Sequence, residues 1–157
     1  MPWGKVPTVW GVFYACWEGE AILALRFPDQ APNGPFAGAP LLEVLAAELS
    51  AYFQGLSAEF SVPARLDGPP FCQRVWEEIR RIPYGETLTY RELAERVGHP
   101  KAARAVGRAL AKNPVPIIVP CHRVVAKQGL GGFGPGLTWK RRLLDLEAAH
   151  KVKFAPR

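Results

Sequence analysis

The sequence has few of the side chains that build disulfide frameworks and metal sites. Its 157 residues include three cysteines and three histidines, and none of them are paired as Cys-x-x-Cys or His-x-x-x-His. An odd number of cysteines without regular spacing argues against a disulfide scaffold and favours a reducing compartment. We therefore expect no metal ion and a cytoplasmic location.

Long apolar runs are missing as well. No stretch approaches the roughly 18 uninterrupted apolar residues that a membrane-spanning helix needs. The N-terminus also lacks the basic start and the apolar core of a secretory signal. We expect a protein with no membrane segment, long enough for one ordinary domain or for two small ones.

Charge is unevenly distributed along the chain. Residues 1–65 contain three basic and six acidic residues, which gives −3, whereas residues 66–157 contain 17 basic and eight acidic residues, which gives +9. A strongly basic segment is typical of a surface that binds nucleic acid. A solvated surface that only keeps the protein soluble would have the same composition, so charge alone leaves both interpretations open.

The beginning of the chain has the pattern of a β-hairpin. Residues 6–16 and 21–27 are strand-like runs, and they flank a turn at residues 17–20 that contains glycine. The following segment, residues 28–39, is rich in proline and glycine and has little periodicity, which predicts a loop.

A helix and a linker complete the first part. Pro40 suits the first turn of a helix, an apolar stripe with helical spacing follows, and Gly55 is placed to end it. Residues 59–63 could add a third strand. The proline-rich segment 63–70 predicts a linker, and we place the domain boundary after residue 66. This first part looks like a scaffold, because nothing in it suggests chemistry.

The second part begins with three short helices. An amphipathic helix is predicted for residues 71–82. Thr89 and Glu92 have the spacing of a capping box, at the start of a helix that runs to about Val97. A short turn leads to another helix over residues 101–112, so the last two helices form a helix-turn-helix pattern.

The second helix of this pair carries basic side chains on one face. Arg104, Arg108 and Lys112 follow one another at intervals of four residues, and Lys101 stands at the start. Gly107 costs such a helix about 1 kcal/mol relative to alanine, which suggests that something approaches its backbone closely. That could be another helix, but a slim helix with a basic face also fits the surface of a DNA duplex.

Cys121 has the surroundings of a nucleophile. His122 and Arg123 follow it directly, and an apolar run with three prolines precedes it. A neighbouring histidine or cation promotes the thiolate, which is the nucleophilic form, and the prolines restrict the loop that carries the sulfur. The alternative is a buried cysteine that acts as a small apolar residue, which is how we interpret Cys16 and Cys72.

A glycine-rich loop and a closing helix end the chain. The loop, residues 129–136, lacks the Gly-Lys-Ser/Thr ending of a P-loop and does not follow the strand pattern of a dinucleotide fold, so we expect neither ATP nor NAD and no cofactor. The helix, residues 137 to about 150, carries Glu147 among inward leucines. This carboxylate could be solvated at the edge or could orient His122 in a cysteine–histidine–acid arrangement.

These motifs together resemble the O6-alkylguanine-DNA alkyltransferase family. The resemblance rests on Tyr90, Lys101-Ala102-Ala103-Arg104-Ala105-Val106-Gly107, Asn113-Pro114-Val115-Pro116, Pro120-Cys121-His122-Arg123-Val124 and Leu143-Leu144-Asp145-Leu146-Glu147. It is dense over residues 70–149, and the Pro-Cys-His-Arg core is highly specific. It implies a DNA repair protein that moves alkyl groups from O6 of guanine, and in many members O4 of thymine, permanently to its own sulfur.

The resemblance also implies a role for each matching residue of the site. Cys121 would accept the alkyl group, His122 would take its proton through a water, and Glu147 would hold the imidazole. Asn113 would brace the active-site turn by hydrogen bonds. Tyr90 would donate its hydroxyl proton toward the leaving guanine.

The implied contacts with double-stranded DNA lie mainly on the helix-turn-helix, where Arg104 would enter the base stack as the damaged base is flipped out. The full set of expected DNA contacts is Arg104, Tyr90, Lys101, Ala103, Arg108, Lys112 and Arg123. The expected lining of the base pocket is Pro116, Val119, Gly132, Phe133 and Gly134. Pro135 replaces a glycine common in the family, and Gly134 replaces a residue that is often polar, so the tolerated size of the alkyl group stays open.

The residues and the resemblance predict an α+β fold. A small N-terminal α/β domain, residues 1–66, with a hairpin-based sheet and a helix, precedes a mainly helical, winged-helix-like DNA-binding domain, residues 67–157, with the helix-turn-helix. We expect a monomer that acts on duplex DNA containing O6-alkylguanine. Two rival functions are a non-catalytic binder of alkylated DNA and a thiol hydrolase that uses Cys121, His122 and Glu147.

Overall fold

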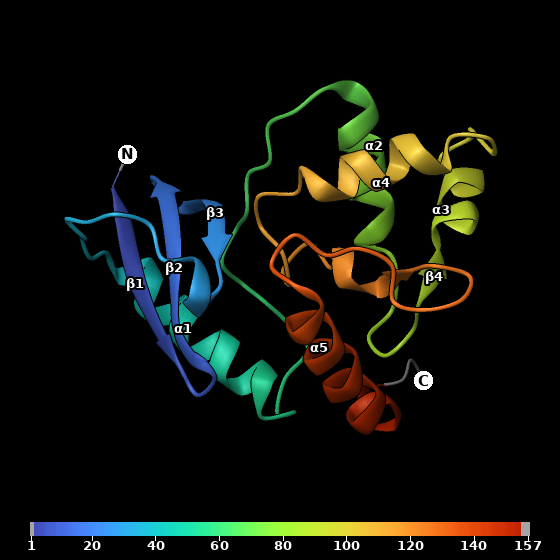
Figure 1. Ribbon diagram of the computed structural model, residues 1–157. Helices are drawn as coiled ribbons and strands as arrows, with labels where there is room; N and C mark the ends of the chain where they lie inside the picture. Colours follow the sequence, from blue (N-terminus) through green and yellow to red (C-terminus); the bar gives the residue numbers. More distant parts are fainter. Residues whose placement is uncertain (1, 155–157) are drawn as a thin grey trace. The chain divides into compact units, whose positions relative to one another are not determined.

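The computed structural model describes residues 2–154. The chain divides into two compact units, Met1–Leu66 and Asp67–Arg157. In the first unit an antiparallel sheet has the strand order β1-β2-β3, and the second unit combines helices with a two-stranded parallel pair, β4 and β5 (Figure 1). This mixture of strands and helices confirms the α+β fold class. Within the described residues, no helix is both long enough and apolar enough to span a bilayer.

The sheet of the first unit has three strands where the sequence predicted two. Strand β1 is Trp3–Thr8, β2 is Gly11–Glu18 and β3 is Ala21–Arg26. The prediction of one strand over residues 6–16 is wrong because the chain reverses at Gly11, whose φ of 119° is open to glycine but strained for other residues. The Thr8 hydroxyl closes this turn by donating to the Gly11 carbonyl at 2.8 Å.

Helix α1, Pro40–Phe53, packs on β1 and begins with the expected proline. The strand proposed for residues 59–63 does not form. There the backbone N–H groups of Ser61 and Val62 donate to the carboxylate of Glu48, at 2.9 and 3.2 Å, instead of to a neighbouring strand. After this segment the chain meets the sheet at Ala64, which forms an isolated bridge with Ile22, and the Ile22 N–H donates to the Pro63 carbonyl at 2.8 Å.

The helices of the second unit follow the predicted order, with shifted ends. Helix α2 is Pro70–Ile79, α3 is Tyr90–Arg96, α4 is Ala103–Ala111 and α5 is Leu137–His150. Helix α2 ends before residue 82 because the N–H of Ile82 bonds three residues back, to Ile79, in a tightened turn. Helix α4 starts two residues later than predicted, because a turn closed by the Ala102 N–H and the His99 carbonyl precedes it.

The capping box at α3 is confirmed. The Thr89 side chain accepts from the Glu92 N–H at 3.1 Å, and the Glu92 carboxylate accepts from the Thr89 N–H at 3.0 Å. Thr89 also ends the short strand β4, Leu88–Thr89, which pairs with β5, Val124–Val125. This pairing brings the start of α3 next to the residues that follow Cys121.

Candidate active site around Cys121

Cys121 lies on a constrained turn rather than after a strand. The run before it folds back on itself, with a bridge between Pro116 and Val119, and Ile117 has a φ of 74°. A β-branched residue rarely adopts this left-handed conformation, so the turn is held under local strain of the kind that clusters at functional sites. The Cys121 N–H then bonds the Val119 carbonyl at 2.8 Å.

Asn113 holds both ends of this turn. Its carbonyl oxygen accepts from the Val115 N–H at 3.0 Å, and its NH₂ group donates to the Val119 carbonyl at 2.9 Å. The bracing role expected for Asn113 therefore has a geometric basis, because one side chain ties two backbone positions four residues apart.

The Cys121 thiol is buried, with 8% of the residue exposed. Burial raises its pKa to about 11, although a hydrogen bond with Asn113 and the charge of Lys140 act in the opposite direction. The sequence led us to expect a thiolate promoted by the neighbouring histidine and cation. The structure differs, because desolvation outweighs the effects of Asn113 and Lys140, and a thiol with a pKa of about 11 is protonated at neutral pH.

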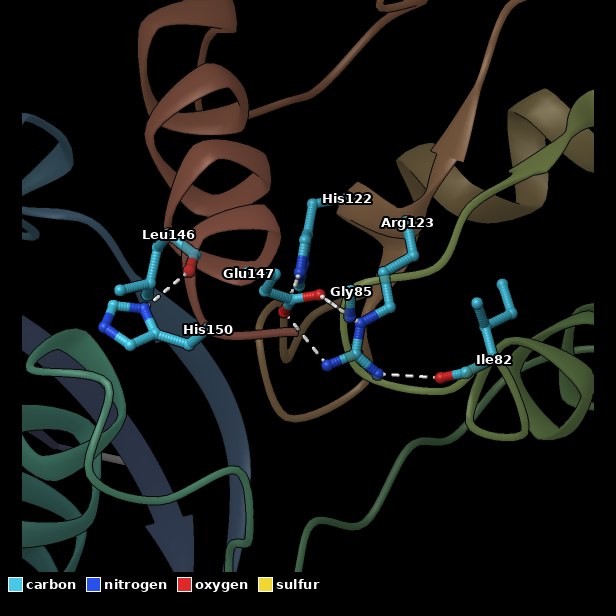
Figure 2. Close-up of polar contacts among 7 residues, drawn as sticks. All are labelled: Ile82, Gly85, His122, Arg123, Leu146, Glu147 and His150. Atoms are coloured by element: carbon cyan, nitrogen blue, oxygen red, sulfur yellow. Dashed lines mark hydrogen bonds and ion pairs between the residues drawn. The ribbon is translucent and has the colours of Figure 1, made fainter. Parts of the chain in front are cut away.

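The two residues after Cys121, His122 and Arg123, form a buried network with Glu147 (Figure 2). Nε2 of His122 lies 2.7 Å from Oε2 of Glu147. Arg123 donates to the two carboxylate oxygens at 2.8 and 2.9 Å and to the Ile82 carbonyl at 2.8 Å. The Gly85 N–H adds a further donor to Glu147 at 3.1 Å, so the carboxylate is saturated with donors.

This network determines which nitrogen of His122 can act as a base. Burial alone raises the pKa of Glu147, but the hydrogen bonds and charges of His122 and Arg123 outweigh it and hold that pKa well below the usual range. Burial lowers the pKa of His122, so the ring is neutral at pH 7. Because the ionised carboxylate can only accept, Nε2 carries the proton and Nδ1 keeps a free lone pair. Nδ1 is buried and has no partner in the described structure.

Arg123 differs from our expectation. We predicted that it would contact DNA, but its side chain is 11% exposed and each of its three guanidinium nitrogens donates to Glu147 or Ile82. A bidentate arginine–carboxylate pair of this kind is among the strongest in proteins. Arg123 therefore braces the active-site network from inside, and the structure does not support a contact with DNA.

Tyr90, the first residue of α3, contacts the glycine-rich loop. Its hydroxyl oxygen accepts from the Gly132 N–H at 3.0 Å, which leaves the hydroxyl proton available to another acceptor. Gly131 needs to be glycine here, because its φ is 73° and a Cβ would lie 2.5 Å from the Tyr90 oxygen. The loop thus passes directly over the tyrosine.

The residues that we expect to line the base pocket differ in how deeply they are buried. Pro116 and Val119 are buried in the turn before Cys121, Phe133 is half-buried, and Gly132 and Gly134 are exposed. No Cβ at Gly132 or Gly134 would meet another atom within 4 Å, so the loop leaves open space there.

The basic face of α4 is exposed. Arg104 and Arg108 point to solvent, as do Lys101 before the helix and Lys112 at its C-cap, while Ala103 is half-buried. A Cβ at Gly107 would meet nothing within 4 Å. Packing against another helix of this chain therefore does not explain the glycine.

Lys140 is a buried charged residue that the sequence analysis missed. It lies on α5 and is fully buried, and its ammonium donates to the Val124 carbonyl at 2.7 Å and the Gly132 carbonyl at 3.0 Å. A signal was present, because Lys140, Leu143 and Glu147 share one face of the helix at intervals of three and four residues. A lysine on an apolar face is normally assumed to be solvated.

Comparisons with known proteins agree with this geometry. Residues 70–149 match the family model of the 6-O-methylguanine DNA methyltransferase DNA-binding domain. A methylated-DNA–protein-cysteine methyltransferase of Mycobacterium leprae is 52% identical over 121 residues, which cover 76% of this chain and 69% of the relative. A protein of the same name from Metallosphaera sedula is 43% identical over 138 residues, which cover 84% and 83%.

Solved structures give the same result for the fold. The crystal structure of Mycobacterium tuberculosis OGT in complex with DNA has a TM-score of 0.84 and 40% identity, and covers 94% of this chain and 93% of that one. An O6-methylguanine DNA methyltransferase from Methanococcus jannaschii has a TM-score of 0.70 and 31% identity, and covers 87% and 88%. On the strength of the matched domain and of these relatives, the chain belongs to the methylated-DNA–protein-cysteine methyltransferase family.

Proposed function

We propose that this protein repairs alkylated DNA by moving the alkyl group from O6 of a flipped guanine to the sulfur of Cys121. The observation that carries the proposal is the arrangement around this sulfur. Asn113 braces its turn, and His122 beside it has a free Nδ1 fixed by Glu147. The relatives' names and the DNA complex of the Mycobacterium tuberculosis protein support the same activity.

The bonds and protons of this step balance. The sulfur attacks the alkyl carbon, the S–C bond forms, and the bond from carbon to O6 of guanine breaks. The thiol proton leaves to Nδ1 of His122 through a water, and Glu147 stabilises the imidazolium that results. Tyr90 donates its free hydroxyl proton toward the departing guanine, which ends as neutral guanine once the protons have re-equilibrated.

The product explains why one protein molecule repairs one lesion. A thioether has no carbonyl that water could attack, so the His122–Glu147 pair has no route to regenerate the thiol. Repair is therefore stoichiometric, and a Cys-His-Glu hydrolase would behave differently because its thioester turns over.

We further propose that α4 docks on the duplex with its exposed basic face. A base inside a duplex is inaccessible to in-line attack, so it has to be extruded at a cost of a few kcal/mol. Arg104 at the start of α4 would fill the vacated stack, and Arg108 and Lys112 would contact phosphates. The open space at Gly107 lets the DNA backbone approach the helix.

Mass spectrometry of the protein after incubation with O6-methylguanine DNA tests the proposal. We expect one added methyl group, on the Cys121 peptide, and a stop after one equivalent. Cys121→Ala should abolish transfer while damaged DNA still binds, and Cys72→Ala, which removes another buried thiol of the same unit, should retain transfer. Unmodified Cys121 with bound DNA would support a binder, and many turnovers would support a hydrolase; either result rejects the proposal.

Arg104→Ala tests the flipping role. We expect a larger loss in extrusion of the damaged base, read by the fluorescence of a base analogue at that position, than in affinity for undamaged duplex. Equal losses in the two measurements would mean that Arg104 only contributes charge.

We also propose a cytoplasmic location. The three cysteines are all unpaired, although each is buried in the structure. Free thiols persist in reducing compartments. Cell fractionation with an antibody against the protein would test the location, and recovery from an oxidising compartment would contradict it.

A further inference from the structure

A buried lysine without a carboxylate partner lies beside the site. Among residues 2–154 the buried polar and charged side chains are His122, Arg123, Lys140 and Glu147. Lys140 is completely buried, and its ammonium bonds two backbone carbonyls. Carbonyls satisfy its donors but carry no charge, and an ammonium buried without a counter-charge is costly.

The charges of this buried set do not cancel while Cys121 is a thiol. Glu147 and Arg123 neutralise each other in their bidentate pair, and His122 is neutral. Lys140 remains; its charge interacts with Cys121 and also disfavours a proton on His122. The set becomes neutral overall when Cys121 loses its proton.

The other groups near Cys121 do not change this balance. Helix α5 supplies Lys140 and Glu147, and α3 supplies Tyr90, whose hydroxyl oxygen accepts from the Gly132 N–H. Helix α2 also contacts the turn that carries Cys121, and Cys72 is the one ionisable side chain on its buried face in the described structure. Asn113 contributes a dipole but no charge.

From this geometry we propose that Lys140 is a positioning residue for alkyl transfer: its buried ammonium is the counter-charge for the Cys121 thiolate and also fastens the glycine-rich loop over the site. The inference rests on the proposed function, because it concerns the same sulfur.

The second part of this role follows from the peptide of Gly132. Its N–H donates to the Tyr90 hydroxyl and its carbonyl accepts from Lys140. Side chains of two helices, α3 and α5, therefore hold the loop at this single residue. The same ammonium also bonds Val124, directly after the turn of Cys121. One charged group thus joins the strand β5, which follows the Cys121 turn, to the loop that we expect to border the base.

The charge of Lys140 lowers the pKa of Cys121, and burial lowers the pKa of Lys140 itself to about 8. The effect of Lys140 on the pKa of Cys121 should therefore decrease above pH 8, as the ammonium loses its proton. A lysine that only filled space or fastened the loop would show no such dependence on pH.

The test is the rate at which iodoacetamide modifies Cys121 in DNA-free protein between pH 6.5 and 10, followed by mass spectrometry of the Cys121 peptide. At pH 7 we expect the wild type to react about tenfold faster than Lys140→Met, which corresponds to one unit in the thiol pKa. The two curves should converge as the pH rises above about 8. Parallel curves, coincident curves or a faster variant would overturn the proposal.

Two further variants sharpen this experiment. Lys140→Arg keeps a cation that does not lose its proton in this range, so its advantage over Lys140→Met should persist to pH 10. Lys127→Met removes an exposed lysine from the same unit and should follow the wild type. The Cys16 and Cys72 peptides in each sample report any general loosening of the fold.

A second measurement applies if Lys140→Met does not fold. Cys121→Asp and Cys121→Asn have nearly the same shape and differ in charge, and both retain Lys140. With a counter-charge in place, the aspartate variant should keep its stability relative to the asparagine variant as the pH rises from 5 to 7. A relative loss of stability over that range would mean that no cation compensates an anion at position 121, and would overturn the proposal.

The outcomes also separate this inference from the proposed function. The iodoacetamide experiment contains no DNA, so it can succeed even if methyl transfer from DNA fails. Conversely, a wild-type protein that takes a methyl group from DNA but shows curves parallel to those of Lys140→Met would retain the proposed function and lose the role of Lys140.

Discussion

The sulfur of Cys121 is subject to two opposing influences. Burial excludes water from the reaction but raises the thiol pKa to about 11, away from the reactive form. Asn113 and Lys140 lower that pKa, and Nδ1 of His122 has a free lone pair that can receive the proton. The thiolate is therefore expected to form as the reaction begins, with the proton passing to His122, rather than to persist in the resting protein.

Glu147 is the residue on which the buried network depends. Replacement by glutamine keeps the shape but removes the charge, so the Arg123 guanidinium stays buried without its counter-charge. We expect Glu147→Gln to lower the free energy of unfolding by about 3–5 kcal/mol and to slow methyl transfer. Denaturant unfolding and single-turnover transfer measure the two effects.

The control for this prediction is Glu95→Gln, which removes a carboxylate from an exposed pair with Arg91 on α3. Its cost should stay below about 1 kcal/mol. Measuring the free energy of unfolding over a range of pH checks the direction of the effect of Glu147. The depressed pKa of Glu147 means that its contribution is present above the ordinary carboxyl pKa and is lost in acid, so Glu147→Gln should reduce this acid dependence. Equal costs for the two variants would contradict the buried-charge argument.

At the scale of elements, two short strands position the site. Strands β4 and β5 have two residues each, yet their pairing joins the start of α3 to the end of the Cys121 turn. The capping box fixes where α3 begins, and Tyr90 is its first residue. The position of the tyrosine hydroxyl thus follows from a local motif combined with one parallel pairing.

Gly107 makes α4 less stable than alanine would, and we propose that close approach of DNA to the helix is the reason for it. We expect Gly107→Ala to raise the free energy of unfolding by up to about 1 kcal/mol, because the added methyl group meets nothing within the protein. The same methyl group should weaken binding to duplex DNA. Thermal unfolding and fluorescence anisotropy with a labelled duplex measure the two effects.

The reciprocal variant on the same helix, Ala105→Gly, serves as the control. It should lower stability by a similar amount without adding bulk. If Gly107→Ala bound DNA with unchanged affinity, close approach of the backbone would not be the reason for this glycine.

For the whole molecule, the separation of charge predicts where DNA affinity comes from. The first 65 residues have a net charge of −3 and the remainder has +9, so phosphate contacts should come from the second unit. We expect affinity for undamaged duplex to fall steeply with salt, and Arg108→Ala to reduce the slope of log K against log salt by about 1. Arg65→Ala, which removes an exposed arginine of the first unit, should leave the slope unchanged. Equal changes in slope would contradict this division of charge.

Predictions from sequence succeeded where a feature depends on neighbours along the chain. The capping box of Thr89 and Glu92 was recognisable because both hydrogen bonds lie within one turn of helix. The strand over residues 6–16 failed for a related reason. Its apolar pattern continues through a reversal that only the positive φ of Gly11 reveals.

The sequence by itself determined the chemistry and the family, through the order Pro-Cys-His-Arg and the spacing of the helix-turn-helix. The tertiary structure alone decided that Arg123 faces Glu147, that Lys140 is buried near the sulfur, and that Cys121 is a thiol at rest. The physical reason is that burial and charge pairing join residues far apart along the chain, such as Gly85 and Glu147, which are 62 positions apart. A pattern of neighbouring residues carries the type of reactive group, but its protonation depends on what the fold places around it.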